Sequence, residues 1–170
     1  MRSRIDNFTF DTMITFQRSN YLNPDFQKFC EELNKEFWVR YPDSQHNFEP
    51  YNKVDESARI IVVYDDNIAI GCGSFRAMKE RNTMEIKRMY VGPDWRGAGI
   101  ARRILSELER WAGEEGYEQS VLETGVKQPE AIALYSRAGY TQIPNYPPYV
   151  EVKESICMKK KLPDSQLSSR

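Results

Sequence analysis

VGPDWRGAGIA, residues 91–101, joins the end of an apolar strand to the start of an amphipathic helix. Small residues in this segment let backbone N–H groups come close to an anion, and the dipole of the following helix favours negative charge at the same place. The segment therefore predicts a binding site for a phosphate or pyrophosphate. The alternative is tight packing between the strand and the helix, which needs no ligand.

Two other phosphate-binding motifs do not fit this segment. A P-loop needs Lys and Ser or Thr after its second glycine, but Gly97 is followed by Ala98. A dinucleotide-binding fingerprint needs Gly or Ala three positions after Gly99, where the chain has Arg102. Both motifs are therefore excluded here.

Hydrophobic periodicity predicts the elements on either side of this segment. Alternation from Phe8 to Phe16 indicates a half-buried strand, and helical spacing after the N-cap Asn23 and Pro24 indicates an amphipathic helix. The order β-α-β-β-β-α-β-α-β-β predicts a single α+β domain with a mixed sheet over residues 1–162, followed by a flexible tail at 163–170. The expected elements are strands at 8–16, 58–64, 68–75, 84–91, 120–122, 140–143 and 155–159, and helices at 24–38, 100–112 and 129–138.

Composition excludes several classes of protein. The 170 residues include 24 Lys+Arg and 25 Asp+Glu, which argues against nucleic-acid binding through bulk phosphate attraction. No apolar run reaches the roughly 18 residues of a membrane span. Three cysteines, widely spaced and odd in number, favour a reducing compartment. With a single histidine, His46, the chain has too few ligands for a Cys/His zinc site. We therefore expect a cytoplasmic protein with no metal and no nucleic-acid or membrane partner; a homodimer is left open.

The chain resembles the GNAT family of N-acetyltransferases. Residues 96–101, RGAGIA, fit the family signature Arg/Gln-x-x-Gly-x-Gly/Ala, and residues 85–91, EIKRMYV, precede it as the family's fourth strand does. Residues 128–140 resemble a later helix with its Leu-Tyr-x-x-x-Gly-aromatic ending. The resemblance is clear over residues 60–149. It implies a GNAT-like fold, in which helices flank a mixed sheet with a splayed strand pair, and direct acetyl transfer from acetyl-CoA to an amine in a ternary complex.

The resemblance also implies which residues bind acetyl-CoA. The strand at 84–91 would separate from the strand at 120–122, and backbone groups of Met89, Tyr90 and Val91 would pair with the pantetheine arm. The side chains of Met89 and Tyr90 are equally candidates for the core. Gln128 stands where many members carry Asn, with its polar group one methylene further out. The pyrophosphate would lie against Arg96, Gly97, Ala98, Gly99, Ile100 and Ala101.

Two carboxylates are candidates for the base that removes a proton from the amine. Glu85 matches the position of the catalytic glutamate in the histone-acetylating branch; its alternative is a solvated strand-edge carboxylate paired with Lys87. Glu123 follows an apolar strand and should lie at the splay, where it would bind a cationic amine or accept its proton. Structural hydrogen bonding is the alternative for Glu123, and the choice of base stays open.

Tyr135 is the candidate general acid. The resemblance places a tyrosine here, and a phenol with a pKa near 10 is protonated at neutral pH, so it can give a proton to the leaving sulfur of CoA. The alternative is a core aromatic, because Tyr135 shares an apolar helical face with Ala131, Ile132 and Leu134.

The acceptor pocket should be formed by the end of the first helix and a proline-rich loop. Arg40 suggests a carboxylate on the substrate, although a solvated surface arginine is the alternative. The near-neutral surface shows no docking stripe, so we expect a small-molecule amine acceptor; a protein lysine or N-terminus and a non-catalytic acyl-CoA sensor are the alternatives. The expected wall residues are Trp38, Arg40, Tyr41, Asn145, Tyr146 and Tyr149.

Overall fold

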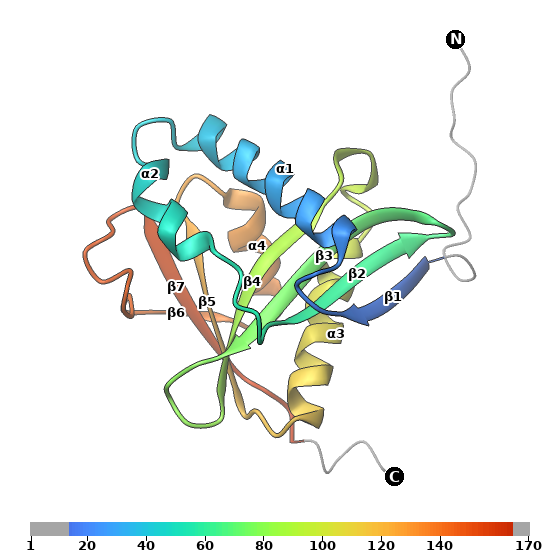
Figure 1. Cartoon of the computed structure of the whole chain (residues 1–170). Coiled ribbons are helices and arrows are strands. Elements are labelled where there is room, and N and C mark those ends of the chain that lie inside the picture. The colour runs from blue at the N-terminus through green and yellow to red at the C-terminus, as the bar shows by residue number, and fades with distance from the viewer. Residues whose placement is uncertain (1–13, 165–170) are drawn as a thin grey trace.

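A mixed sheet in the order β1-β2-β3-β4-β5-β7-β6 organises the chain (Figure 1). The computed structural model describes residues 14–164. The strands are β1 (Ile14–Ser19), β2 (Arg59–Asp65), β3 (Ile68–Ala77), β4 (Thr83–Val91), β5 (Gln119–Gly125), β6 (Thr141–Ile143) and β7 (Ser155–Lys161). The helices are α1 (Pro24–Arg40), α2 (Gln45–Phe48), α3 (Ile100–Glu114) and α4 (Pro129–Arg137), with 3-10 turns η1 (Glu49–Asn52) and η2 (Pro93–Trp95).

This order confirms the predicted α+β fold with a mixed sheet. The strand expected at 8–16 runs from Ile14 to Ser19 among the described residues, and its expected first part lies outside them. Most of the expected tail, residues 165–170, lies outside them as well, so the domain limits stay a prediction. No helix within residues 14–164 has both the length and the apolar character needed to cross a membrane.

Strand β2 is buried on both faces, because α1 and α3 cover opposite sides of the sheet (Figure 1). Ile60 and Val62 belong to the hydrophobic cluster formed with α1, whereas Ile61 and Val63 belong to the cluster formed with α3. Successive strand residues point to opposite faces, so alternate positions contribute to alternate clusters. Each fully buried side chain of this kind contributes about 1.5–3 kcal/mol to folding.

Helix α1 begins as its sequence predicts. The Asn23 side chain accepts hydrogen bonds from the backbone N–H groups of Asp25 and Phe26, at 3.0 and 3.1 Å. Pro24 occupies the first helical position, where no N–H partner is needed. This cap sets where α1 starts and therefore which residues lie at the C-terminal end of the helix.

Strands β4 and β5 are paired over only part of their length. They run parallel, joined by the crossover helix α3, and their ladder ends at the pair Ile86–Leu122. Beyond it β4 continues beside β3 as far as Val91, and β5 continues beside β7 as far as Gly125. The predicted splayed strand pair is thus confirmed. We call the point after Ile86–Leu122 the fork.

A β-bulge lies on β4 directly after the fork. Arg88 has a φ of 56°, and the register with β3 shifts between Cys72 and Ser74 on the opposite strand. A bulge bends its strand and increases its local twist. The bulge therefore turns the end of β4 at the place where β5 leaves it.

Candidate functional site

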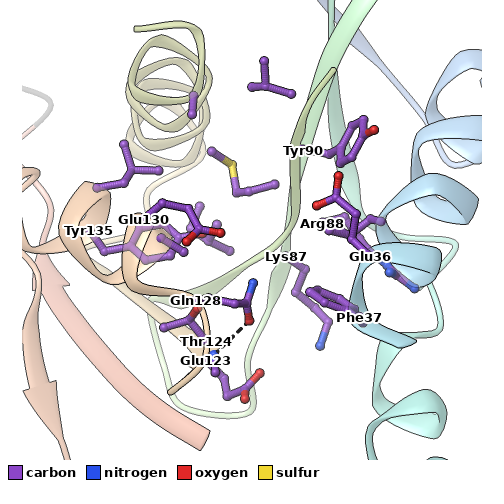
Figure 2. Close-up of a pocket in the computed structure, with 18 of the residues that line it drawn as sticks. Glu36, Phe37, Lys87, Arg88, Tyr90, Glu123, Thr124, Gln128, Glu130 and Tyr135 are labelled. Carbon is purple, nitrogen blue, oxygen red and sulfur yellow. Dashed lines mark hydrogen bonds between the residues drawn. The ribbon is translucent and has the colours of Figure 1, made fainter. Parts of the chain in front are cut away.

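A cavity of about 580 Å³ opens at the fork. Its walls come from α1 and α2, the free ends of β4 and β5, the start of α3, and α4 (Figure 2). Cavities of this size commonly hold small molecules or cofactors. The fold thus brings the predicted anion-binding segment and the candidate carboxylates to one place.

Two glycines shape one end of the cavity. Gly97 and Gly99 have φ values of 79° and 80°, a backbone conformation that favours glycine, and no atom lies within 4 Å of the place where a Cβ would stand. Helix α3 begins after Gly99 without a side-chain cap, so its first N–H groups keep their hydrogen-bonding capacity. Ile100 and Ala101 also line the cavity, whereas Ala98 is exposed and does not.

Arg96 connects this segment to α1. Its Nε donates to the Val91 carbonyl at 2.8 Å, and its Nη2 lies 2.5 Å from a carboxylate oxygen of Glu36. The guanidinium also lies 5.4 Å from the centre of the Tyr90 ring. Arg96 therefore holds α1 beside the loop and has a carboxylate partner of its own.

The end of β4 presents a free backbone edge. Residues Met89, Tyr90 and Val91 lie beyond the fork, where β5 no longer pairs with β4. The Tyr90 ring packs on Phe29 of α1, with 5.4 Å between ring centres, and Met89 is partly buried against the α3 cluster. Both side chains pack in the core, while the backbone edge that faces β5 has no strand partner within residues 14–164.

Glu123 is the first residue of β5 beyond the fork. It is half-buried, and its carboxylate accepts a hydrogen bond of 2.6 Å from the Ser155 hydroxyl. Burial raises the pKa of Glu123 to about 7, while the Ser155 hydrogen bond and the charge of Lys87 act in the opposite direction. A carboxylate of this pKa exchanges protons at neutral pH.

Glu85 lies before the fork and is deeply buried, with an exposed fraction of 1%. It lies 2.9 Å from Arg76, its direct neighbour on β3, and 3.6 Å from Lys87, and it accepts a hydrogen bond of 2.7 Å from the Tyr146 hydroxyl. The alternative of a solvated strand-edge carboxylate is wrong, although the pairing with Lys87 is present. Two cations and a phenol thus share the Glu85 charge.

Tyr135 reaches the cavity from α4 (Figure 2). It is buried, its ring centre lies 5.9 Å from that of Tyr140, and burial raises the pKa of its phenol above the usual value. Within residues 14–164 its hydroxyl has no hydrogen-bond partner. The side chain is therefore both part of the core and a protonated group at the cavity surface.

Gln128 precedes α4 and lines the cavity. Its side-chain oxygen accepts a hydrogen bond of 3.0 Å from the backbone N–H of Gly125, drawn as a dashed line in Figure 2. This bond holds the turn that follows β5. It uses the oxygen of the carboxamide and leaves the NH₂ group as a donor.

The end of α1 is joined to the start of α4 at the cavity mouth. Arg40 pairs with Glu130 and donates to the Lys127 carbonyl at 3.0 Å, and the Tyr41 hydroxyl accepts from the Lys127 N–H at 2.9 Å. Arg40 and Tyr41 therefore line the cavity as expected, but the Arg40 charge has a carboxylate partner within the protein. Trp38 is 44% exposed and lies outside the lining.

The loop before β7 contributes one predicted residue to the cavity wall. Tyr149 is buried, and its hydroxyl accepts a hydrogen bond of 3.3 Å from Lys87. Tyr146 reaches Glu85 from outside the lining. The Asn145 amide donates to three backbone carbonyls at 3.1–3.3 Å, two in its own loop and one at Ser155, the first residue of β7. The structure thus does not bring Asn145 to the cavity.

Several wall residues had no signal in the sequence. Glu36 is half-buried on α1 and Glu130 is exposed on α4, and their partners Arg96 and Arg40 are distant along the chain. Lys87 fits the alternation of a strand, yet it lies in the wall, where burial lowers the pKa of its ammonium group. Only the fold shows that these charges meet.

Comparison with known proteins gives consistent matches over most of the chain. A family model described as the Acetyltransferase (GNAT) family matches residues 22–140. An IAA acetyltransferase of Azospirillum brasilense is 32% identical over 150 residues, which are 88% of this chain and 98% of the relative.

Solved structures share the fold. A Klebsiella pneumoniae protein assigned as an acyl-CoA N-acyltransferase matches with a TM-score of 0.73 and 27% identity, over 88% of this chain and 98% of that one. The PaiA N-acetyltransferase of Thermoplasma acidophilum, solved in complex with coenzyme A, has a TM-score of 0.65 at 15% identity, over 86% of this chain and 99% of that one.

Proposed function

The chain belongs to the GNAT acetyltransferase family, and from this premise we propose that it transfers the acetyl group of acetyl-CoA to a primary amine of a small molecule. One observation carries the proposal. At the fork, a free strand edge, a carboxylate with a pKa near 7 and a protonated phenol face the same cavity. A base, an acid and a binding edge are the parts that acyl transfer to an amine needs.

The residues at the cavity fit acetyl-CoA, which supplies an activated acetyl thioester when bound. The open space at Gly97 and Gly99 and the uncapped start of α3 suit a pyrophosphate. Arg102 and Arg137 are exposed cations in the same wall and add positive charge. The free edge of β4 offers backbone N–H and carbonyl groups to the amides of a pantetheine arm.

We assign the role of general base to Glu123. At neutral pH about half of a group with a pKa near 7 is ionised and able to accept a proton. Glu85 is the weaker candidate, because Arg76, Lys87 and Tyr146 already share its charge. We assign Glu85 a positioning role, in which it holds Lys87 beside Tyr149 in the wall.

We assign the role of general acid to Tyr135. The raised pKa of its phenol keeps a proton on the hydroxyl at neutral pH, and the hydroxyl has no acceptor within residues 14–164. The hydroxyl can therefore donate a hydrogen bond to the leaving sulfur and supply the proton as negative charge develops there. The ring packing against Tyr140 fixes the direction in which the hydroxyl points.

The cavity supports a small-molecule acceptor, and the free cysteines support a reducing compartment for the protein. The cavity of about 580 Å³ would hold part of acetyl-CoA as well as the acceptor, which favours a small acceptor. The relative from Azospirillum is named for IAA rather than for a protein acceptor. Cys30, Cys72 and Cys157 are buried free thiols, which suits the cytoplasm.

Amine-dependent release of free CoA tests this function. The protein is mixed with acetyl-CoA and with amino acids, polyamines, aminoglycosides or peptides, and the released thiol is measured. At least one small amine should raise the rate at least about tenfold over the rate without amine, and peptides should not. Tight CoA binding with no amine-stimulated release would overturn the proposal in favour of a non-catalytic acyl-CoA sensor.

A further inference from the structure

Arg88 carries a half-buried positive charge in the cavity wall and forms no ion pair within residues 14–164. The exposed wall cations Arg102 and Arg137 are hydrated by solvent, but Arg88 lies beneath α1. Three neighbouring wall cations each have a carboxylate partner, in the pairs Lys87–Glu85, Arg40–Glu130 and Arg96–Glu36.

Within the described part of the chain, the Arg88 guanidinium donates hydrogen bonds only to neutral oxygen atoms. Its Nη1 donates to the Asn34 side chain at 2.8 Å, and its Nη2 donates to the Asn52 carbonyl. Its Nε is buried and has no acceptor among residues 14–164. A charge held away from water without a counter-ion is unfavourable, and an anion bound beside it would relieve that cost.

Backbone geometry places Arg88 at the mouth of the fork. It lies two residues beyond Ile86 on β4, and Glu123 lies one residue beyond the paired Leu122 on β5. The positive φ of Arg88 and the bulge direct its side chain toward α1, as Figure 2 shows. Glu123 and Arg88 therefore flank the same opening from different strands, a proton acceptor on one side and a cation on the other.

We propose that Arg88 binds a carboxylate of the acceptor, so that the acceptors are amines that also carry a carboxylate, as amino acids do. The inference rests on the proposed acetyl transfer and narrows its substrate class. A guanidinium offers several N–H donors in one plane, which match the two oxygens of a carboxylate. The unpaired Nε supplies one such donor. Arg40, which the sequence suggested for this task, is already paired with Glu130.

A purely structural role for Arg88 makes a different prediction. In that case its bonds to Asn34 and Asn52 only hold α1 and η1 against the bulge. Loss of the side chain would then weaken the binding of every acceptor to the same extent, and it would lower the affinity for CoA as well. Acceptor kinetics with and without the carboxylate separate the two roles.

The experiment compares the common α-amino acids, β-alanine and 4-aminobutyrate with their primary amides. Rates are referred to the concentration of unprotonated amine, because amidation changes the pKa of the amine. For the wild-type protein we expect kcat/KM to be at least about tenfold higher for the acid than for its amide, mainly because the acid has the lower KM. Equal values for acid and amide would overturn the inference and leave the proposed function intact. Release of CoA with a polyamine or an aminoglycoside but with no acid or amide would also overturn the inference. Failure of every amine of the screen to release CoA would overturn the proposed function itself.

Variants of Arg88 test whether the preference for the acid over its amide comes from this residue. Arg88→Gln should raise KM for the acid at least about tenfold. It should leave KM for the amide within twofold of the wild-type value and leave the affinity for CoA unchanged. Arg88→Lys keeps the charge but not the planar donors, so its KM for the acid should lie between those of the wild type and Arg88→Gln. This variant provides a second test if Arg88→Gln does not fold. Arg81→Gln removes an exposed charge on the β3–β4 loop and serves as the control. Equal losses for acid and amide would assign Arg88 a structural role.

Discussion

Ile86 of β4 and Leu122 of β5 form the last pair of their parallel ladder. Each strand keeps its other neighbour beyond that pair, so only the edges that face each other become free. Arg88 and Glu123 follow within two residues, and Tyr135 reaches the same opening from α4. The proposed chemistry therefore depends on where one strand pairing stops.

The pH dependence of turnover should report Glu123. Because its pKa is raised to about 7, Glu123 holds a proton at lower pH and cannot accept one from the amine. We expect kcat/KM to rise with pH through an apparent pKa near 7. Glu123→Gln should lower turnover about 10²–10⁴-fold and abolish this dependence. Glu151→Gln, at an exposed position, is the matched control; wild-type turnover in Glu123→Gln would exclude Glu123 as the base.

Tyr135→Phe removes one hydroxyl and keeps the ring that packs on Tyr140. If the hydroxyl supplies the proton to the leaving sulfur, kcat should fall about tenfold to a thousandfold while acetyl-CoA affinity stays nearly unchanged. Steady-state kinetics and calorimetry measure the two quantities separately. Full activity in the folded variant would leave Tyr135 with a packing role alone.

Gly99→Val should weaken CoA binding at least about tenfold, or roughly 1.4 kcal/mol. Valine disfavours the φ of 80° that Gly99 adopts, and its side chain would occupy the open space proposed for the phosphates. Gly113→Ala, within the helix that Gly99 precedes and also with open space at its Cβ, is the control and should bind CoA normally. Calorimetry with CoA measures both, and wild-type affinity in Gly99→Val would mean that the phosphates lie elsewhere.

Gly125→Ala should disturb the joint between α1 and α4. A Cβ at this position would lie 2.7 Å from Cζ of Tyr41 and closer still to its hydroxyl, whose bond to Lys127 holds the cavity mouth. Overpacking of this kind costs about 1–3 kcal/mol of stability. In a Tyr41→Phe background, Gly125→Ala should lower the free energy of unfolding by less, because the Tyr41 hydroxyl, the nearest atom to the new Cβ, is absent. Chemical denaturation measures the four proteins, and equal costs in both backgrounds would refute the contact.

Local sequence patterns predicted the elements well, because the signals lie within the elements themselves. Asn23 and Pro24 are adjacent and set the start of α1, and the apolar spacing of α3 lies within one segment. The fork was expected only through the family resemblance. No local pattern shows that a ladder will end at Ile86.

The site was less predictable, because its electrostatics depend on pairs that are distant in sequence. Glu36 and Arg96 are 60 residues apart, and Glu85 and Tyr146 are 61 apart. Neither pair leaves a trace in the chain near either residue. That Arg88 has no counter-ion within residues 14–164 is likewise visible only after Lys87, Arg40 and Arg96 have been matched to their carboxylates.

The central claim is that the cavity at the fork transfers acetyl groups directly to an amine. A single-turnover experiment with isotopically labelled acetyl-CoA, excess protein and one carboxylate-bearing amine tests it most directly. We predict that labelled N-acetyl product forms at the same rate as free CoA and that the protein itself never carries the label. Release of CoA at the same rate without amine, label retained on the protein, or bound acetyl-CoA that never reacts would each contradict the account.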